Sequence, residues 1–162
     1  MEPRWKPNVT VATVVERTSQ QNNKEYLFVH EVRDGKKVYN QPAGHLDEGE
    51  SLAEAAIRET REETGWDVTL THLVGIYRFI GENGITYIRH VFAASPIQHN
   101  PTQALDDGII EAVWMTYEDI VNNTNATRSA MVKSALDDFR KGDVYPLGLL
   151  HEPKMNINQI ST

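Results

Sequence analysis

Apolar, β-branched segments recur along the chain and are separated by polar stretches rich in glycine, proline, asparagine and aspartate. Such runs predict strands. Asp34-Gly35 is a hairpin-turn signal between two of them, and Gly75 interrupts a longer run as a bulge or bend would. The predicted strands are residues 9–15, 25–32, 37–39, 68–79, 85–94 and 109–115.

A helical pattern follows the third predicted strand. It begins near Ser51, with Glu54 three residues later as in a capping box, and it ends at Gly65, where a residue with positive φ is expected. The residues between are mostly alanine, leucine, glutamate and arginine, which favour helices. The segment is therefore predicted to form one helix.

Two further helices are predicted after the last strand. A short one is capped by Thr116, with Asp119 three residues on, and a longer one spans residues 128–141 and ends at Gly142. Residues 40–45 and 95–108 are predicted loops, and residues 145–150 are expected to pack back on the body. Strands on both sides of one helix, followed by two helices, predict an α/β fold with a mixed sheet between helices.

The carboxylates of the first helix cluster on an unexpected face. At about 100° per residue, Glu59, Glu62 and Glu63 overlap the apolar side of the helix, which Leu52, Ala55 and Ala56 form. Hard oxygen donors clustered in this way suit Mg²⁺ or Mn²⁺. The pattern alone fits a solvated surface better, in which Arg58 pairs with Glu54 and Glu62.

Composition narrows the classes of partner. The 162 residues fit a single domain, expected over residues 6–150, with a loosely ordered tail at 151–162. A net charge of −7 argues against a broad nucleic-acid surface, and no apolar run is long enough for a membrane span. With no cysteine and no signal-type start, the chain is expected to be cytoplasmic.

The order of residues identifies a family resemblance. Gly44, Glu50 and the run Arg58-Glu59-Thr60-Arg61-Glu62-Glu63-Thr64-Gly65 match the Nudix hydrolase signature at each of its fixed charged and glycine positions. Thr60 departs mildly, because the family usually has an aliphatic residue there. The resemblance implies a Nudix-type α/β/α sandwich and hydrolysis of a diphosphate linkage with Mg²⁺, for which Mn²⁺ can substitute.

Roles for the motif residues follow from the same resemblance. The implied metal ligands are Glu59, Glu62, Glu63 and the carbonyl oxygen of Gly44, with the three glutamates as catalytic acids. Glu50 and Arg58 resemble residues that orient these acids rather than bind the metal themselves. For Arg58, an ordinary helix salt bridge is an equal alternative.

The family often supplies another acid from outside the motif, as general base or extra ligand. Glu111 is the first candidate here, with Asp106 and Asp107 behind it, although each also fits a solvated acid. Arg89, His90 and His45 are candidates for contact with a substrate phosphate. Glu31 and Tyr87 fit the core edge or the solvent surface better than a pocket.

Residues flanking the motif narrow the resemblance further. Segments 6–12, 40–46 and 128–147 resemble bacterial NudJ-type phosphatases, and the likeness spans residues 6–150. It implies stepwise release of orthophosphate from nucleoside tri- and diphosphates, and action on hydroxymethylpyrimidine and thiamine diphosphates. Two alternatives stay open: a pyrophosphohydrolase of ADP-ribose-type or modified nucleotides, and a catalytically silent nucleotide-binding module. The sequence leaves the oligomeric state open.

Overall fold

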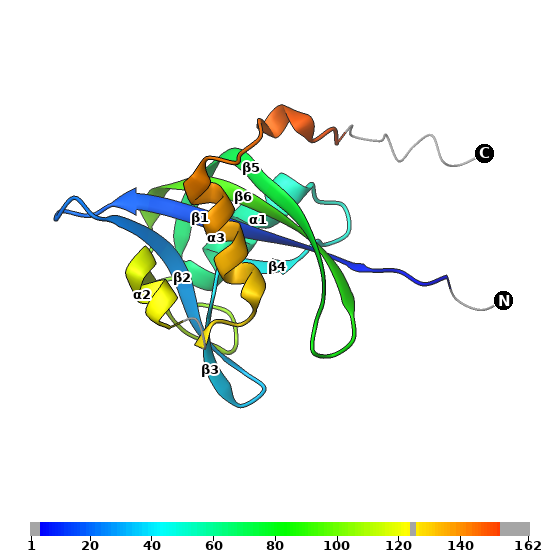
Figure 1. Cartoon of the computed structure of the whole chain (residues 1–162), viewed down its shortest axis with the longest axis horizontal. Coiled ribbons are helices and arrows are strands. Elements are labelled where there is room, and N and C mark those ends of the chain that lie inside the picture. Colours follow the sequence, from blue (N-terminus) through cyan, green and yellow to red (C-terminus); the bar gives the residue numbers. More distant parts are fainter. Residues whose placement is uncertain (1–3, 124–125, 153–162) are drawn as a thin grey trace.

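The structure, a computed structural model, describes residues 4–123 and 126–152. Seven strands form one mixed sheet with the order β3-β2-β1-β6-β5, while β4 pairs with β1 and β7 pairs with β2 (Figure 1). The strands are β1 (Asn8–Thr18), β2 (Lys24–Arg33), β3 (Lys36–Asn40), β4 (Ala43–His45), β5 (Trp66–Ile80), β6 (Thr86–His99) and β7 (Ile109–Thr116). The α-helices are α1 (Leu52–Thr64), α2 (Tyr117–Asn122) and α3 (Ala130–Lys141), followed by a 3₁₀ turn at Leu147–Leu149.

Strand β1 determines where the motif loop enters the sheet. Along one edge it pairs in parallel with β6, and along the other edge it changes partner. Residues 10–12 of β1 pair with β4, whereas residues 16–18 pair with β2. Between these two pairings, the Thr13 N–H donates to the Pro42 carbonyl at 3.0 Å. The segment that leads into α1 is thereby held in a split between β1 and β2.

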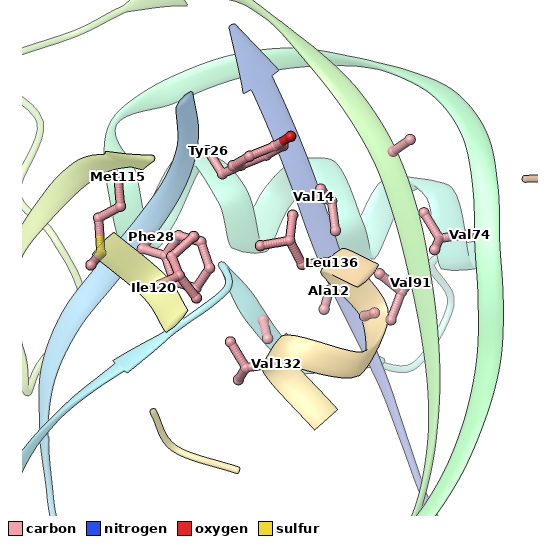
Figure 2. Packing of buried hydrophobic residues seen from close by; sticks show 13 residues of the cluster. Ala12, Val14, Tyr26, Phe28, Val74, Val91, Met115, Ile120, Val132 and Leu136 are labelled. Carbon is pink, nitrogen blue, oxygen red and sulfur yellow. The ribbon is translucent and has the colours of Figure 1, made fainter. Parts of the chain in front are cut away.

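Helices α1 and α3 cover opposite faces of the sheet (Figure 1). Val132, Ala135 and Leu136 of α3 belong to one apolar cluster, in which they meet β1, β2 and β6 residues such as Val14, Phe28 and Val91 (Figure 2). Ala55 and Ala56 of α1 pack in a second cluster with Val11, Leu73 and Phe92. This is the predicted α/β/α sandwich, and burial of these two faces is its main source of stability.

Three predicted boundaries were wrong. Residues 43–45 form β4 rather than a loop, because β1 offers a free edge there. The expected loop at 95–108 begins only after His99, since residues 95–99 pair with the first residues of β5. Helix α3 starts at Ala130, because the Arg128 N–H is bound to the Tyr39 carbonyl at 2.8 Å and so extends the edge of β3.

The remaining local predictions are confirmed. Asp34 and Gly35 have φ of 50° and 74° in the β2–β3 turn, and the pairing of β5 with β6 shifts register between Leu73 and Gly75. Tyr145 pairs with Leu73, so the segment after α3 does pack back. Residues 153–162, most of the predicted tail, lie outside the described residues. Within the described ranges, no helix is both long and apolar enough to cross a membrane.

Candidate active site

Both ends of α1 are capped, which sets the rotation of the helix against the sheet. The Ser51 side chain accepts a hydrogen bond from the Glu54 N–H, and the Ser51 N–H donates one to the Glu54 carboxylate. Gly65 closes the helix with φ of 70°. Because Ala55 and Ala56 sit against the sheet, Glu59 and Glu63, about one and two turns later, lie on the same inward face of the helix. Both glutamates are buried.

Gly44 and Glu59 are in such close contact that any other residue at position 44 would displace the Glu59 carboxylate. A Cβ built on Gly44 would lie 2.1 Å from the Glu59 Cδ. The backbone of β4 therefore passes directly beside the carboxylate of Glu59. This contact gives a physical reason for glycine at the first position of the motif.

Arg58 gathers the acids of the motif. Its Nε and Nη2 donate to both oxygens of Glu50 at 3.0 and 2.6 Å. Its Nη1 donates to Glu59 at 2.8 Å and to Glu62 at 3.0 Å, and Nη2 also reaches the His45 carbonyl at 3.0 Å. The guanidinium holds the pKa of Glu50 below its usual range. Arg58 is thus a hub that orients three carboxylates, rather than an isolated helix salt bridge.

Three carboxylates from two segments converge at one point. Glu59, Glu62 and Asp106 each offer an oxygen within 4.8 Å of the others. The Asp106 N–H donates to the Glu62 carbonyl at 3.2 Å, which docks the loop before β7 onto α1. Burial raises the pKa of Glu59, and partial burial followed by the charge of Glu62 raises that of Asp106. Such a set of hard, mutually repelling oxygen donors fits a divalent ion such as Mg²⁺ or Mn²⁺.

Glu63 lies deeper than the other acids. One of its oxygens accepts a hydrogen bond from the Ala43 N–H at 2.9 Å, which ties α1 to β4. Burial raises the pKa of Glu63 to about 8, and the nearby charges of Glu59, Glu31 and Asp106 act in the same direction. Without a bound cation, this side chain therefore carries a proton near neutral pH.

On the other side of Glu63 lie two arginines and a third buried acid. Arg89 of β6 is only 7% exposed, and burial, followed by the charge of Arg128, lowers its pKa to about 10. Arg128 donates to buried Glu31 of β2 at 3.0 Å. The charges of Glu31 and Glu63 act in the opposite direction and favour the protonated form of Arg89.

The two candidate histidines lie apart. His45 is exposed on β4, and its ring is 6.3 Å from that of Tyr87, next to Arg89 on the same sheet face. His90 follows Arg89 on β6, so its side chain projects from the opposite face. Burial lowers the pKa of His90 and favours its neutral form. The structure thus brings His45, but not His90, to the face that carries Arg89.

Glu111 is not brought to the other acids. It is largely exposed on β7, 3.5 Å from the His30 Nδ1, whereas Asp106, the second candidate, joins Glu59 and Glu62. Asp107 is exposed. Glu31 received little weight in the sequence analysis. It follows buried Leu27 and Val29 at two-residue spacing in β2, and this alternation could have predicted its burial. Arg128 carried no comparable signal, because only tertiary packing brings it to Glu31.

Thr60, where the sequence departs from the family signature, contacts a residue of β1. Thr60 is fully buried, and its Oγ1 lies 2.8 Å from the Oγ1 of Thr13 on β1. The same hydroxyl is 2.7 Å from the Ala56 carbonyl oxygen, to which it donates. The buried polar group is therefore satisfied, and the contact between α1 and β1 is retained.

A separate cavity of about 420 Å³ lies beside α2 and the end of α3. Its lining includes Lys24, Tyr26, Tyr117 and Arg140, and none of the residues described above. With no convergent carboxylates, this cavity lacks the groups that phosphoanhydride chemistry needs.

Comparisons with known proteins agree with the site. The family model described as NUDIX domain matches residues 6–135. The protein named Phosphatase NudJ of Escherichia coli is 36% identical over 146 residues, which cover 90% of this chain and 92% of that protein.

Solved structures give the same result. A NUDIX hydrolase from Nitrosomonas europaea superposes with a TM-score of 0.86 at 38% identity, covering 91% of this chain and 98% of that one. The NUDIX domain of Shewanella oneidensis NrtR, complexed with ADP ribose, has a TM-score of 0.72 at 15% identity, covering 86% of this chain and 90% of that one. The second similarity shows the fold alone.

Proposed function

The chain belongs to the Nudix family, and from this premise we propose that it is a Mg²⁺-dependent phosphatase that releases orthophosphate from nucleoside tri- and diphosphates. Its broader class is a hydrolase of phosphorus-containing acid anhydrides. The observation that carries the proposal is the convergence of Glu59, Glu62 and Asp106 within 4.8 Å. Similarity to Phosphatase NudJ over 90% of the chain supports orthophosphate as the product.

The residues that would hold the ion are Glu59, Glu62, Glu63 and the Gly44 carbonyl, with the Asp106 carboxylate beside them. When bound, the ion would neutralise phosphate charge and lower the pKa of a water molecule. Arg58 keeps Glu59 and Glu62 in place through hydrogen bonds of 2.8 and 3.0 Å. Glu50 in turn holds Arg58, so loss of either residue would disorder the carboxylates rather than remove one.

A general base would accept the proton of the attacking water. We assign this role to Asp106 in place of Glu111, because Asp106 lies with the other acids and Glu111 does not. Partial burial raises the pKa of Asp106, which moves a carboxylate toward the range in which bases work at neutral pH.

Arg89 and His45 would contact the substrate phosphates. Next to them, Phe79 and Tyr87 stack with ring centroids 5.1 Å apart on the same face. Flat aromatic rings accept different heterocycles without reading their edges. This supports tolerance of several organic groups, among them nucleosides and the rings of hydroxymethylpyrimidine and thiamine diphosphates.

Glu59→Gln tests the proposal directly. With GTP and Mg²⁺, we expect kcat to fall about 100-fold or more, because a charged oxygen donor is lost while side-chain volume is kept. Glu48→Gln changes an exposed acid of the segment before α1; it is the matched control and should keep wild-type turnover. Near wild-type turnover of Glu59→Gln would exclude Glu59 as a ligand.

Product analysis separates the alternatives. Orthophosphate from GTP supports the proposal, whereas pyrophosphate, or AMP from ADP-ribose, indicates a pyrophosphohydrolase. A catalytically silent module that binds a nucleotide is the second alternative. Nucleotide binding without turnover under saturating Mg²⁺ and Mn²⁺ would establish it, but every acid of the motif is present here.

A further inference from the structure

Arg89 is a buried cation without a matching anion. Among the described residues no carboxylate lies within ion-pair distance, and its one hydrogen bond is a weak contact from Nε to the Thr10 Oγ1 at 3.4 Å. The Phe79 ring, 5.2 Å from the guanidinium carbon, compensates only in part. Burying a charge without a partner is unfavourable, so a group of this kind indicates a site for an external anion.

Arg128 reaches the same place from a distant part of the chain. Its backbone N–H is bound to Tyr39 at the edge of β3, and Thr127 pairs in parallel with Tyr39. This anchoring directs the side chain to Glu31, whose two oxygens lie 3.0 and 3.4 Å from one nitrogen, Nη1. The side chain is 31% exposed, so part of the guanidinium faces outward.

Together the two arginines have more positive charge than their contacts neutralise. Glu31 balances Arg128, and Arg89 has no equivalent partner. The charge of Arg128 also acts on Arg89 and lowers its pKa. Paired guanidinium groups match the oxygens of a phosphoryl dianion.

The number of charges distinguishes terminal from internal phosphates. A terminal phosphoryl group has more unbridged oxygens and more negative charge than a phosphate that is esterified on both sides. A site with two arginines therefore favours a substrate that ends in phosphate. The charge of Glu63 acts on Arg89, and the charge of Glu59 acts on Glu63, so a phosphate bound by Arg89 would lie near the acid cluster.

We propose that Arg89 and Arg128 form a paired-guanidinium site for the terminal phosphoryl group, and that Glu31 positions Arg128 in it. The role of this site in catalysis rests on the proposed phosphatase function. It would place the terminal phosphorus, rather than an internal one, next to Glu59, Glu62 and Asp106, so that orthophosphate leaves.

Binding without hydrolysis tests the site. ADP and ADP-ribose share the same diphosphate, but only ADP ends in a free phosphoryl group. By calorimetry in EDTA, we expect the wild type to bind ADP about 10-fold tighter than ADP-ribose. Arg128→Gln should weaken ADP binding about 10- to 100-fold and change ADP-ribose binding less than about threefold.

Controls separate loss of the site from loss of the fold. Arg78→Gln removes an exposed arginine of β5 and should leave both affinities unchanged. Glu31→Gln with Arg128→Gln avoids leaving a buried carboxylate unpaired, and it should reproduce the selective loss. Arg128→Lys keeps the charge but loses the planar fork, so it should fall between wild type and Arg128→Gln.

The outcomes are decisive in either direction. Absence of a wild-type preference for ADP, or equal losses for both ligands in the double variant, would overturn the site. The proposed function fails on a different result, namely pyrophosphate or AMP as the product with Mg²⁺. A selective loss of ADP affinity combined with such products would retain the site and refute only the phosphatase function.

Discussion

Helices α1 and α3 cover opposite faces of the same sheet and have nearly equal lengths, yet they bury different chemistry. Both follow a serine and end at a glycine with positive φ. The inward face of α3 presents Val132, Ala135 and Leu136. The inward face of α1 starts with Ala55 and Ala56 and then buries Glu59 and Glu63.

The contrast separates stability from function. Apolar burial under α3 favours folding, whereas burial of carboxylates under α1 opposes it unless a cation binds. The capping box, the hydrogen bond from Ala43 and the hub at Arg58 hold α1 in place despite that cost. We therefore expect changes in α3 to affect the free energy of unfolding and changes in α1 to affect activity.

The largest expected effect on stability is that of Leu136→Ala. Leu136 is fully buried in the α3 cluster, so its truncation should lower the free energy of unfolding by about 2–5 kcal/mol. Urea denaturation followed by circular dichroism measures it. Activity per folded molecule should stay near wild type; a specific loss of kcat would contradict the division between the helices.

The next effect is a pH dependence that belongs to α1 alone. In EDTA, the pKa of Glu63 is about 8 when folded, against an ordinary 4.5. Between pH 4.5 and 8, Glu63 is therefore protonated in the folded state and ionised in the unfolded state. The contribution of Glu63 to stability is therefore complete below pH 4.5 and falls as pH rises to 8, by up to about 1.4 kcal/mol per pH unit.

Glu63→Gln should reduce this slope, leaving the contributions of Glu59 and Asp106, whose pKa values are also raised. Leu136→Ala should keep the full slope at lower overall stability. The midpoints of denaturation in EDTA, measured from pH 5 to 8, test this prediction. That range lies within the interval between 4.5 and 8 in which the slope is expected. If wild type and Glu63→Gln show the same slope, Glu63 does not carry the proton.

The smallest expected effect compares the two N-caps. Ser51 forms a complete capping box, whereas the Ser129 side chain makes no capping hydrogen bond. Ser51→Ala should therefore lower the free energy of unfolding by about 1 kcal/mol, and Ser129→Ala by a few tenths at most. Equal losses in thermal denaturation would mean that the caps do not distinguish the helices.

Local signals predicted most of the elements, and the errors occurred where partners are distant. The Ser51–Gly65 helix and the turn at Asp34-Gly35 depend on their own residues, and both were correct. The extension of β6 to His99 depends on pairing with Trp66. The late start of α3 depends on a hydrogen bond to Tyr39. Neither partner is visible in a local window.

The site divides in the same way. The order Gly44, Glu50, Arg58 to Gly65 by itself predicted the family, the helix and the acids on its inward face, because these features follow from spacing along one helix and the loop before it. The choice of Asp106 over Glu111, and the arrival of Arg128 at Glu31 and Arg89, depend on strand pairing and loop docking between segments far apart in the chain. Periodicity specifies which face of an element a residue occupies, but only packing decides what that face meets.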